Sequence, residues 1–360
     1  MNNNKIKILA ILGMFLTILT SSFFTTNKNK KNLVMKNVVE PIKIESVTIE
    51  KAKEQPIEKP VEKIKKIVIS AVGDCTLGKD VNASYINSYN EYFDNNGASY
   101  FFSKVKNIFE DDDLTIANLE NAFTDSKEYA VKKWVYSGKP SYAKILKEAD
   151  IEVVSLANNH TMDYLEKGLE DTKKALEDYG IEYAYKNIIN YREIKGIKIA
   201  IVSIAWDTFD DIKQYLAEAN NNSDLQIVCM HSGNNYDKNY IKKQEILAYF
   251  LVYNGADLVL GHHPHVLQGI EKYKGVYIAY SLGNFSYGGK RTLGSENDTM
   301  ILQASFDYIG KKLINNEINI IPAYCSSSFP KNDYQPMIIE DDEEKERVKQ
   351  KILSLSKNIN

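Results

Sequence analysis

The stretch ADLVLGHHPHV, residues 256–266, joins an apolar run to three histidines within four positions. The chain has only five histidines, and the other two also follow apolar runs: His160 in SLANNHTMD and His231 in IVCMHSG. Short runs rich in Val, Ile and Ala suit strands that are buried on both faces. The pattern therefore predicts a sheet whose strands carry histidine where they end.

Six further apolar runs predict the remaining strands of this kind. They are KIVISAVGD (66–74), DLTIANLE (113–120), IEVVSLANNH (151–160), IKIAIVSIAWD (197–207), LQIVCMH (225–231) and VYIAYSLGNF (276–285). Helical patterns lie between several of them, at 139–149, 164–180 and 239–255, and the last two end in glycine, a usual helix stop. Alternation of strands and helices predicts an α/β fold. An antiparallel part (299–325) and a closing helix (341–356) follow.

The N-terminal part of the chain predicts a membrane anchor and a tether. Residues 8–24 carry no charge, and this run is about as long as the apolar core of a signal peptide. We expect an uncleaved signal anchor, a transmembrane segment, over residues 1–26, with a cleaved secretory signal as the alternative. Residues 27–66 are rich in Lys, Glu and Pro and predict a disordered tether. Residues 67–360 would then form a folded domain outside the cytoplasm, held at the cell membrane.

Composition argues against several classes of function. The net charge of −3 and the pI of about 6.1 give no reason to expect a nucleic-acid partner. The three cysteines have no CxxC spacing, so we expect neither a disulfide framework nor a zinc ribbon. With 360 residues, the chain is long enough for one large domain or two small ones, with an ample core.

Polar side chains gather where the predicted strands end. Asp74 follows AVG, Glu120 follows ANL, residues 158–160 follow SLA, and His231 follows VCM. Because the loops at the carboxyl ends of parallel strands converge, residues from five segments can meet in one pocket. Carboxylates, an amide and imidazoles together suit Mn, Fe or Zn better than calcium or magnesium. The sequence therefore predicts a divalent metal site at this edge.

Within the histidine triplet, two rings are the favoured ligands. Side chains alternate along an extended strand, so His263 and His265 are expected to point to the same side. His262 would then face the other way, unless the strand has already ended.

Five ordered motifs resemble the CapA family of poly-γ-glutamate capsule synthesis proteins. They are AVGDCTLG (71–78), DDLTIANLENAFTD (112–125), SLANNHTMDYLEKGLEDT (155–172), ADLVLGHHPHVLQGIE (256–271) and YSLGNFSYG (280–288). The resemblance covers about residues 67–357. It implies a layered sandwich like that of the calcineurin-type metallophosphatases, with central β-sheets flanked by helices, preceded here by the N-terminal transmembrane or signal helix. Proteins of this family typically carry such an anchor.

Carried over motif by motif, the resemblance implies a site for one or two divalent ions. The implied metal ligands are Asp74, Glu120 in the bridging position, Asn159, His231, His263 and His265. The implied catalytic residues are Asp74, Glu120 and His160, the last of which assists the leaving oxygen. The candidate substrate-binding residues are Asn158, Ser281 and Asn284. A glycine-containing turn with capping side chains explains the last two equally well.

Three departures from the family patterns bear on catalysis. Thr76 stands where the phosphatase Asp-x-His motif has histidine, which removes one ligand. The second motif has its glutamate in NLE rather than in Gly-Asp-x-x-Asp. His231 is followed by SGNN, whereas CapA-like proteins usually have Trp-Gly and then a glutamate. If that glutamate takes part in the chemistry, the activity here is altered or lost.

Three functions are compatible with these features. The first is a membrane-anchored extracytoplasmic protein of capsule or surface-polymer biosynthesis. It would work with the membrane, with membrane-bound synthesis and export proteins, and with an anionic polymer such as poly-γ-glutamate. The second is a stand-alone metal-dependent phosphoesterase or polymer hydrolase. The third is a non-catalytic scaffold that binds the polymer.

Overall fold

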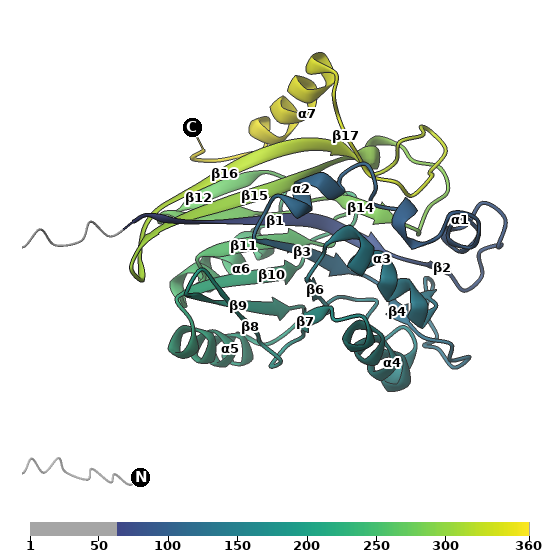
Figure 1. Ribbon diagram of the computed structural model, residues 1–360, viewed down its shortest axis with the longest axis horizontal. Helices are drawn as coiled ribbons and strands as arrows, with labels where there is room; N and C mark the ends of the chain where they lie inside the picture. The colour runs from purple at the N-terminus through teal and green to yellow at the C-terminus, as the bar shows by residue number, and fades with distance from the viewer. Residues whose placement is uncertain (1–62, 360) are drawn as a thin grey trace, which may run out of the picture. The chain divides into compact units, whose positions relative to one another are not determined.

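The computed structural model describes residues 63–359, so the predicted anchor (1–26) and most of the predicted tether (27–66) lie outside the described residues. Two β-sheets face each other across a shared core and carry helices on their outer faces (Figure 1). This confirms the expected mixed α/β fold with central sheets and flanking helices. Among residues 63–359, no helix is both long enough and apolar enough to span a bilayer.

The first sheet has eight strands in the order β17-β16-β15-β1-β3-β6-β7, with β14 also paired to β1. Their bounds are β1 (Lys65–Thr76), β3 (Leu114–Leu119), β6 (Val153–Ser155), β7 (Glu182–Ala184), β14 (Asn284–Tyr287), β15 (Asp298–Ile309), β16 (Lys312–Tyr324) and β17 (Met337–Ile338). The strands β1, β3, β6 and β7 run parallel, and β15, β16 and β17 add antiparallel pairs. The antiparallel part predicted at 299–325 is thereby confirmed.

The second sheet has six strands in the order β12-β13-β11-β10-β9-β8. Their bounds are β8 (Asn190–Ile194), β9 (Ile197–Ile204), β10 (Leu225–His231), β11 (Leu258–His262), β12 (Ile270–Tyr273) and β13 (Val276–Ala279). The four central strands β9, β10, β11 and β13 are parallel, so their carboxyl ends meet at one edge. A small third sheet consists of β2 (Lys79–Asp80), β5 (Tyr136–Gly138) and β4 (Ala122–Phe123).

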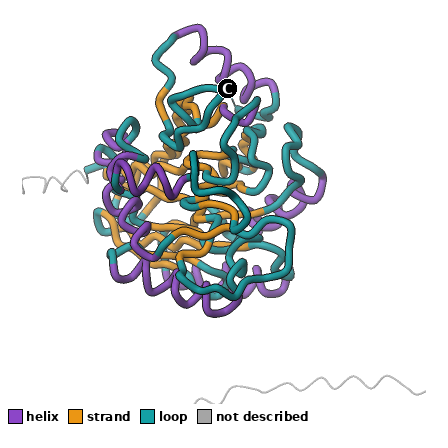
Figure 2. The backbone as a smooth tube through the Cα atoms, turned by 90° about the vertical axis from the view of Figure 1, so that its right-hand side faces the viewer, coloured by secondary structure: helices purple, strands orange, loops and turns teal. Residues whose placement is uncertain are grey.

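The helices lie on the outside of the strands (Figure 2). Those near the first sheet are α1 (Tyr89–Asn96), α2 (Lys106–Glu110), α3 (Ala143–Ala149) and α4 (Leu165–Asp178). The second sheet carries α5 (Phe209–Asn222) and α6 (Lys242–Tyr253), and α7 (Asp342–Ser354) closes the chain. Short 3-10 turns cover Ala98–Tyr100, Pro140–Tyr142 and Ser295–Asn297. The four predicted helices correspond to α3, α4, α6 and α7.

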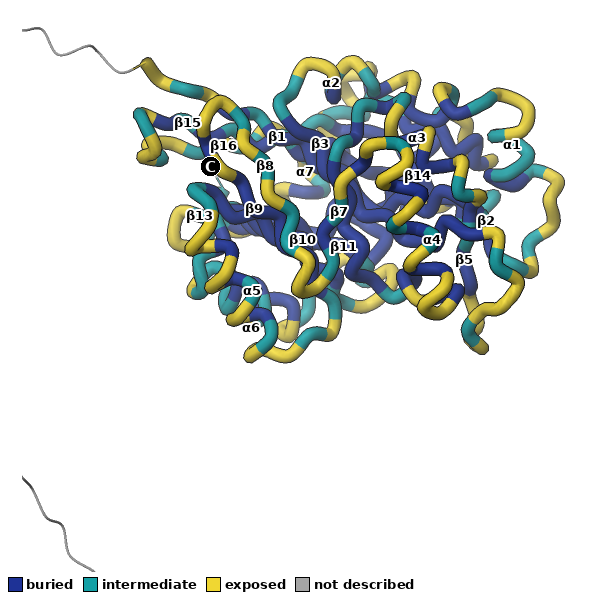
Figure 3. Tube along the Cα trace, turned by 60° about the horizontal axis from the view of Figure 1, so that its bottom comes forward, coloured by how far each residue is buried: buried dark blue, intermediate teal, exposed yellow. Residues whose placement is uncertain are grey.

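Alternation along β9 explains how a nearly continuous apolar run fills two cores. Ile197, Ile199 and Ile201 belong to the core between the sheets. Ala200 and Val202 belong to a separate core with α5 and α6. The same division holds along β10 and β11, and Figure 3 shows these strands as buried. Burial on both faces is why polar and apolar residues do not alternate along the run, in which only Lys198 is exposed.

The predicted strand VYIAYSLGNF is two strands that belong to different sheets. β13 ends at Ala279 in the second sheet, and β14 begins at Asn284 beside β1 in the first. Between them Gly283 adopts φ +74°, and its oxygen accepts the amide of Asp74 at 2.8 Å. A Cβ on Gly73 would lie 2.0 Å from the same oxygen, so the close approach requires glycine. This crossover ties the end of β1 to the second sheet.

Candidate metal centre

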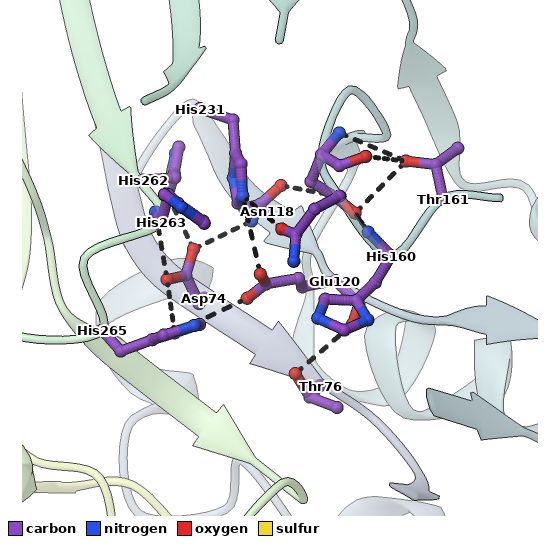
Figure 4. Close-up of polar contacts among 12 residues, drawn as sticks. Asp74, Thr76, Asn118, Glu120, His160, Thr161, His231, His262, His263 and His265 are labelled. Atoms are coloured by element: carbon purple, nitrogen blue, oxygen red, sulfur yellow. Dashed lines mark hydrogen bonds and ion pairs between the residues drawn. The ribbon is translucent and has the colours of Figure 1, made fainter. Parts of the chain in front are cut away.

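The carboxyl ends of strands from both sheets converge on one cluster of polar side chains (Figure 4). Asp74 lies near the end of β1, and Glu120 follows β3 directly. His231 is the last residue of β10, and His262 is the last residue of β11. The labelled carboxylates and imidazoles point toward one another, as the convergence of parallel strand ends requires.

Glu120 lies at the centre of this cluster. It is 0% exposed, and neither carboxylate oxygen has a hydrogen-bond partner among residues 63–359. Its Oε1 lies 3.5 Å from His231 Nε2, and its Oε2 lies 3.8 Å from His265 Nδ1. Burial, together with the charge of Asp74, raises the pKa of Glu120 well above its usual value. A buried carboxylate without donors is costly, and a bound cation would satisfy both oxygens.

Two groups of ligand atoms share Glu120. One group joins it to His231 and His263, and the other joins it to Asp74 and His265. Within each group the ligand atoms lie within 4.8 Å of one another. Such an arrangement fits two cations bridged by one carboxylate.

Two further polar residues, Asn159 and Thr76, contact members of these groups. Asn159 Oδ1 lies 2.8 Å from His231 Nε2, which brings an amide oxygen to the first group. Thr76 instead donates its hydroxyl to the backbone oxygen of Glu120 at 3.4 Å. The second group therefore offers two carboxylates and one imidazole, and the combined donor set suits Mn, Fe or Zn.

The two groups differ in how strongly they hold protons. Burial alone would raise the pKa of Asp74, but the close contacts of its carboxylate with the His262 and His265 rings hold that pKa well below its usual value. Burial opposes the charged form of His265, but Glu120 and Asp74 raise its pKa to about 9. Burial and the neighbouring charge of His265 lower the pKa of His263 to about 4. Burial lowers the pKa of His231 as well. The two imidazoles of the first group are thus ready as neutral ligands, whereas a cation bound by the second group displaces the proton of His265.

The histidine triplet is not extended beyond its first member. β11 ends at His262, and His263 and His265 adopt φ of +99° and +60°. The alternation expected along a strand therefore does not apply, although both later rings reach Glu120. His262 does not face away from the site, because its Nδ1 lies 3.4 Å from Asp74 Oδ1 and the residue is 1% exposed.

His160 belongs to neither ligand group. Its Nδ1 lies 2.7 Å from Asp163 Oδ2, which also accepts the amide of Tyr136 at 2.6 Å. Burial lowers the pKa of His160, and the contact with Asp163 opposes this effect. Lys132 forms an ion pair with the other oxygen of Asp163. This fixed orientation leaves the second ring nitrogen of His160 for holding or delivering a proton.

The three predicted substrate-binding residues make contacts within the protein. The Asn158 amide donates to a backbone oxygen at the end of β3 at 2.8 Å. The Ser281 hydroxyl donates to the backbone oxygen that follows the histidine triplet, also at 2.8 Å. Asn284 Oδ1 lies 2.9 Å from His265 Nδ1, so this residue supports a ring of the cluster. Roles in binding substrate stay predictions for all three.

Sequence reasoning missed two residues beside the cluster. Asn118 donates from Nδ2 to Asp74 Oδ1 at 2.8 Å and lies 3.4 Å from His231 Nδ1. Its place in ANLE, two residues before Glu120, is a signal, because positions two apart share one side of a strand. Trp206 follows the apolar run of β9, and its ring lies 5.7 Å from that of His231.

Residues 68–288 match the family described as bacterial capsule synthesis protein PGA_cap. The chain belongs to this family. Capsule biosynthesis protein CapA of Bacillus anthracis is 33% identical over 302 residues, which cover 74% of this chain and 69% of that protein. PGA biosynthesis protein CapA of Bacillus subtilis (strain 168) is 33% identical over 255 residues, covering 63% of this chain and 65% of that protein. The CapA-type family predicted from the five motifs is confirmed.

The capsule-family match contains the whole cluster, from Asp74 to Asn284. A solved structure described as a novel phosphatase from Mycoplasma pneumoniae shares 16% sequence identity with this chain, at a TM-score of 0.44. That alignment covers 72% of this chain and 95% of the other. At this TM-score the likeness carries no argument about fold or activity.

Proposed function

We propose that this capsule-family protein uses two divalent cations to engage the anionic polymer of a bacterial capsule, outside the cytoplasm and anchored to the membrane. Its sandwich of two sheets would be of the metallophosphatase kind. The family match and the names of the relatives, which concern capsule and PGA biosynthesis, support the polymer. The uncharged residues 8–24 support the anchor. Membrane-bound synthesis and export proteins are the expected partners.

The observation that carries the metal centre is the buried, unpartnered carboxylate of Glu120 between two groups of ligand atoms. One cation would be held by the first group (Glu120, His231 and His263) together with Asn159. The other would be held by the second group (Asp74, Glu120 and His265). Bound divalent cations supply Lewis acidity to a carboxylate, amide or phosphoryl oxygen of the substrate. Asn118 and His262 orient Asp74, and Asn284 orients His265.

A second candidate function, hydrolysis of the polymer or of a phosphoester, is favoured by the contact between His160 and Asp163. In this reaction the oxygen of water bonds to the carbonyl carbon or phosphorus, and the bond to the leaving nitrogen or oxygen breaks. His160 gives a proton to the leaving atom, and a proton from the attacking water restores it. Asp163 holds the ring in the orientation that this transfer needs.

Metal analysis and polymer binding on the full-length protein test the proposal. We expect one to two equivalents of Mn, Fe or Zn, about the number that the two ligand groups hold, and polymer binding that a chelator removes. The double variant His231→Ala, His263→Ala should lose both properties. The matched control is His160→Asn, which lies outside the ligand groups and should keep metal and polymer but lose any hydrolysis.

The alternatives give different results in the same experiment. A metal-free protein that binds γ-linked glutamate polymer equally well would refute the metal centre and leave a scaffold. A metal-loaded protein that ignores the polymer but cleaves a generic phosphodiester would be a stand-alone phosphoesterase. Membrane fractionation with external protease tests the anchor, since the folded domain should be membrane-bound and accessible from outside.

A further inference from the structure

A pocket of about 780 Å³ lies beside the metal centre and shares His231 with it. It is formed by the residues after β9, the start of α5, the loop after β10 and the start of α6. The residues that line it include Trp206, Phe209, Lys243 and Ile246. Its volume falls within the range of about 300–1,000 Å³ that is usual for ligand pockets.

Trp206 connects this pocket to the metal centre. Its ring centroid lies 5.7 Å from the ring centroids of both His231 and His263, yet the residue is 61% exposed. Its φ of +54° lies in the left-handed region, which is unfavourable for a bulky side chain. Backbone strain of this kind persists where the surrounding structure enforces it, and it clusters at ligand sites.

The walls of the pocket combine exposed apolar surface with the ammonium group of Lys243. Phe209 is 50% exposed and Ile246 is 49% exposed. Lys242 pairs with Glu245, whereas Lys243 has no ion-pair partner among residues 63–359. Apolar faces next to an unpaired ammonium group favour a ligand that has an aliphatic part and an anionic part.

The acidic side chain in the lining does not oppose this preference strongly. Asp207 accepts the backbone amide of Ala205 at 2.8 Å, and burial raises the pKa of its carboxyl. Its charge is therefore partly satisfied within the loop, while Lys243 remains available at the other wall.

We propose that this pocket is a subsite for the stretch of polymer next to the group held at the metal centre. The occupant is an aliphatic chain bearing carboxylates, with methylenes against Trp206 and Phe209 and a carboxylate at Lys243. A γ-linked glutamate chain has this chemistry, because each unit contributes methylenes to the backbone and carries one carboxylate. The subsite rests on the proposed function, since the cations must hold a neighbouring group of the same chain.

Intrinsic fluorescence provides a direct reading of occupancy. The chain has two tryptophans, so Trp134→Phe leaves Trp206 as the only indole. We expect γ-linked glutamate oligomers to change the emission of the metal-loaded, full-length Trp134→Phe protein saturably. Affinity should increase with oligomer length until the pocket is filled. In Trp206→Phe, the emission of Trp134 should not change on addition of the oligomers.

Two substitutions test the contacts independently. Trp206→Gly removes the ring and suits the positive φ at this position, and Lys243→Glu reverses the free charge. We expect each to weaken oligomer binding about tenfold or more, with metal content unchanged. Lys213→Glu is the matched control, because Lys213 is exposed on α5 outside the pocket lining and should keep wild-type affinity. Glutamate oligomers with α linkages, whose backbone lacks the methylenes, should not distinguish wild type from Trp206→Gly.

The outcomes separate this subsite from the proposed function. If metal-loaded wild type binds γ-linked oligomers and both variants bind them equally well, the subsite is overturned and the proposed function stands. If wild type holds metal but binds no γ-linked oligomer, the proposed function fails and the subsite fails with it. If Trp206→Gly loses metal together with oligomer and Lys243→Glu loses neither, Trp206 merely supports the metal centre and the subsite is overturned.

Discussion

Replacing Glu120 with Gln should stabilise the metal-free protein and destabilise the metal-loaded protein relative to wild type. Without metal, both oxygens of Glu120 are buried and have no hydrogen-bond partner among residues 63–359. An unsatisfied buried group costs about 1–3 kcal/mol, and more when it is charged. The isosteric amide cannot ionise, so we expect it to avoid the cost of the charge, which we take to be of this size. Since each kcal/mol shifts Tm by roughly 2 °C in a large domain, we expect a rise of about 2–6 °C.

The stability that Glu120→Gln gains over wild type in the metal-free protein should increase as the pH rises. Burial and the charge of Asp74 raise the pKa of Glu120 above its unfolded value of about 4.3. The folded wild type therefore retains a proton that the unfolded chain has lost, and wild type loses stability as pH rises from about 4.3 through the raised pKa. Gln does not titrate, so the advantage of the variant should widen over this window and vanish below it.

Metal should reverse the order of the two melting temperatures. A cation that binds only the folded protein stabilises wild type by about 4.1 kcal/mol at a concentration about one thousand times its Kd, which exceeds the expected advantage of the metal-free variant. Glu120→Gln removes the anion that both ligand groups share, so the variant should gain much less. Melting curves with chelator and with Mn²⁺ or Zn²⁺ measure both differences. Equal metal-induced shifts in the two proteins, or a variant that is less stable without metal, would refute the reasoning. Glu152→Gln, outside the cluster, is the control and should show no reversal.

Three other changes give measurable outcomes. His265 has a pKa of about 9 without metal, so calorimetry in buffers of different ionisation enthalpy should detect proton release on metal binding at pH 7. This release should fade as the pH passes about 9, and its absence at pH 7 would contradict the ligand role. Burial lowers the pKa of His160 and the Asp163 carboxylate raises it. Asp163→Asn removes that carboxylate, so an NMR titration should show a still lower pKa for His160. Arg347→Met breaks contacts of 2.7 and 2.9 Å to the mostly buried Asp298. Urea unfolding should show that the free energy of unfolding falls by about 1–2 kcal/mol. An unchanged midpoint would mean that this partly exposed ion pair contributes nothing to stability.

The sequence by itself determined the long buried strands, the antiparallel part, four of the seven α-helices described in residues 63–359, and the edge where the polar cluster lies. Runs such as 197–204 are apolar at every position but two, Lys198 and Ser203, because both faces of β9 are buried, and this signal is local. Glycine as a helix stop is also a local signal. It predicted the ends of two helices at Gly180 and Gly255, and both residues have positive φ. Polar residues that follow apolar runs mark strand ends, and parallel strand ends converge, so Asp74 and His231 were expected to meet.

Only the tertiary structure decided how the cluster is divided and what surrounds it. It separated Asp74 and His265 from His231 and His263 as two ligand groups. It brought His262 against Asp74 and set Trp206 beside the rings. It also divided 276–285 between two sheets. These results depend on contacts between segments far apart in the chain, such as the oxygen of Gly283 with the amide of Asp74. A local pattern shows that a side chain is at a strand end, but the packing of two sheets sets which atoms it faces.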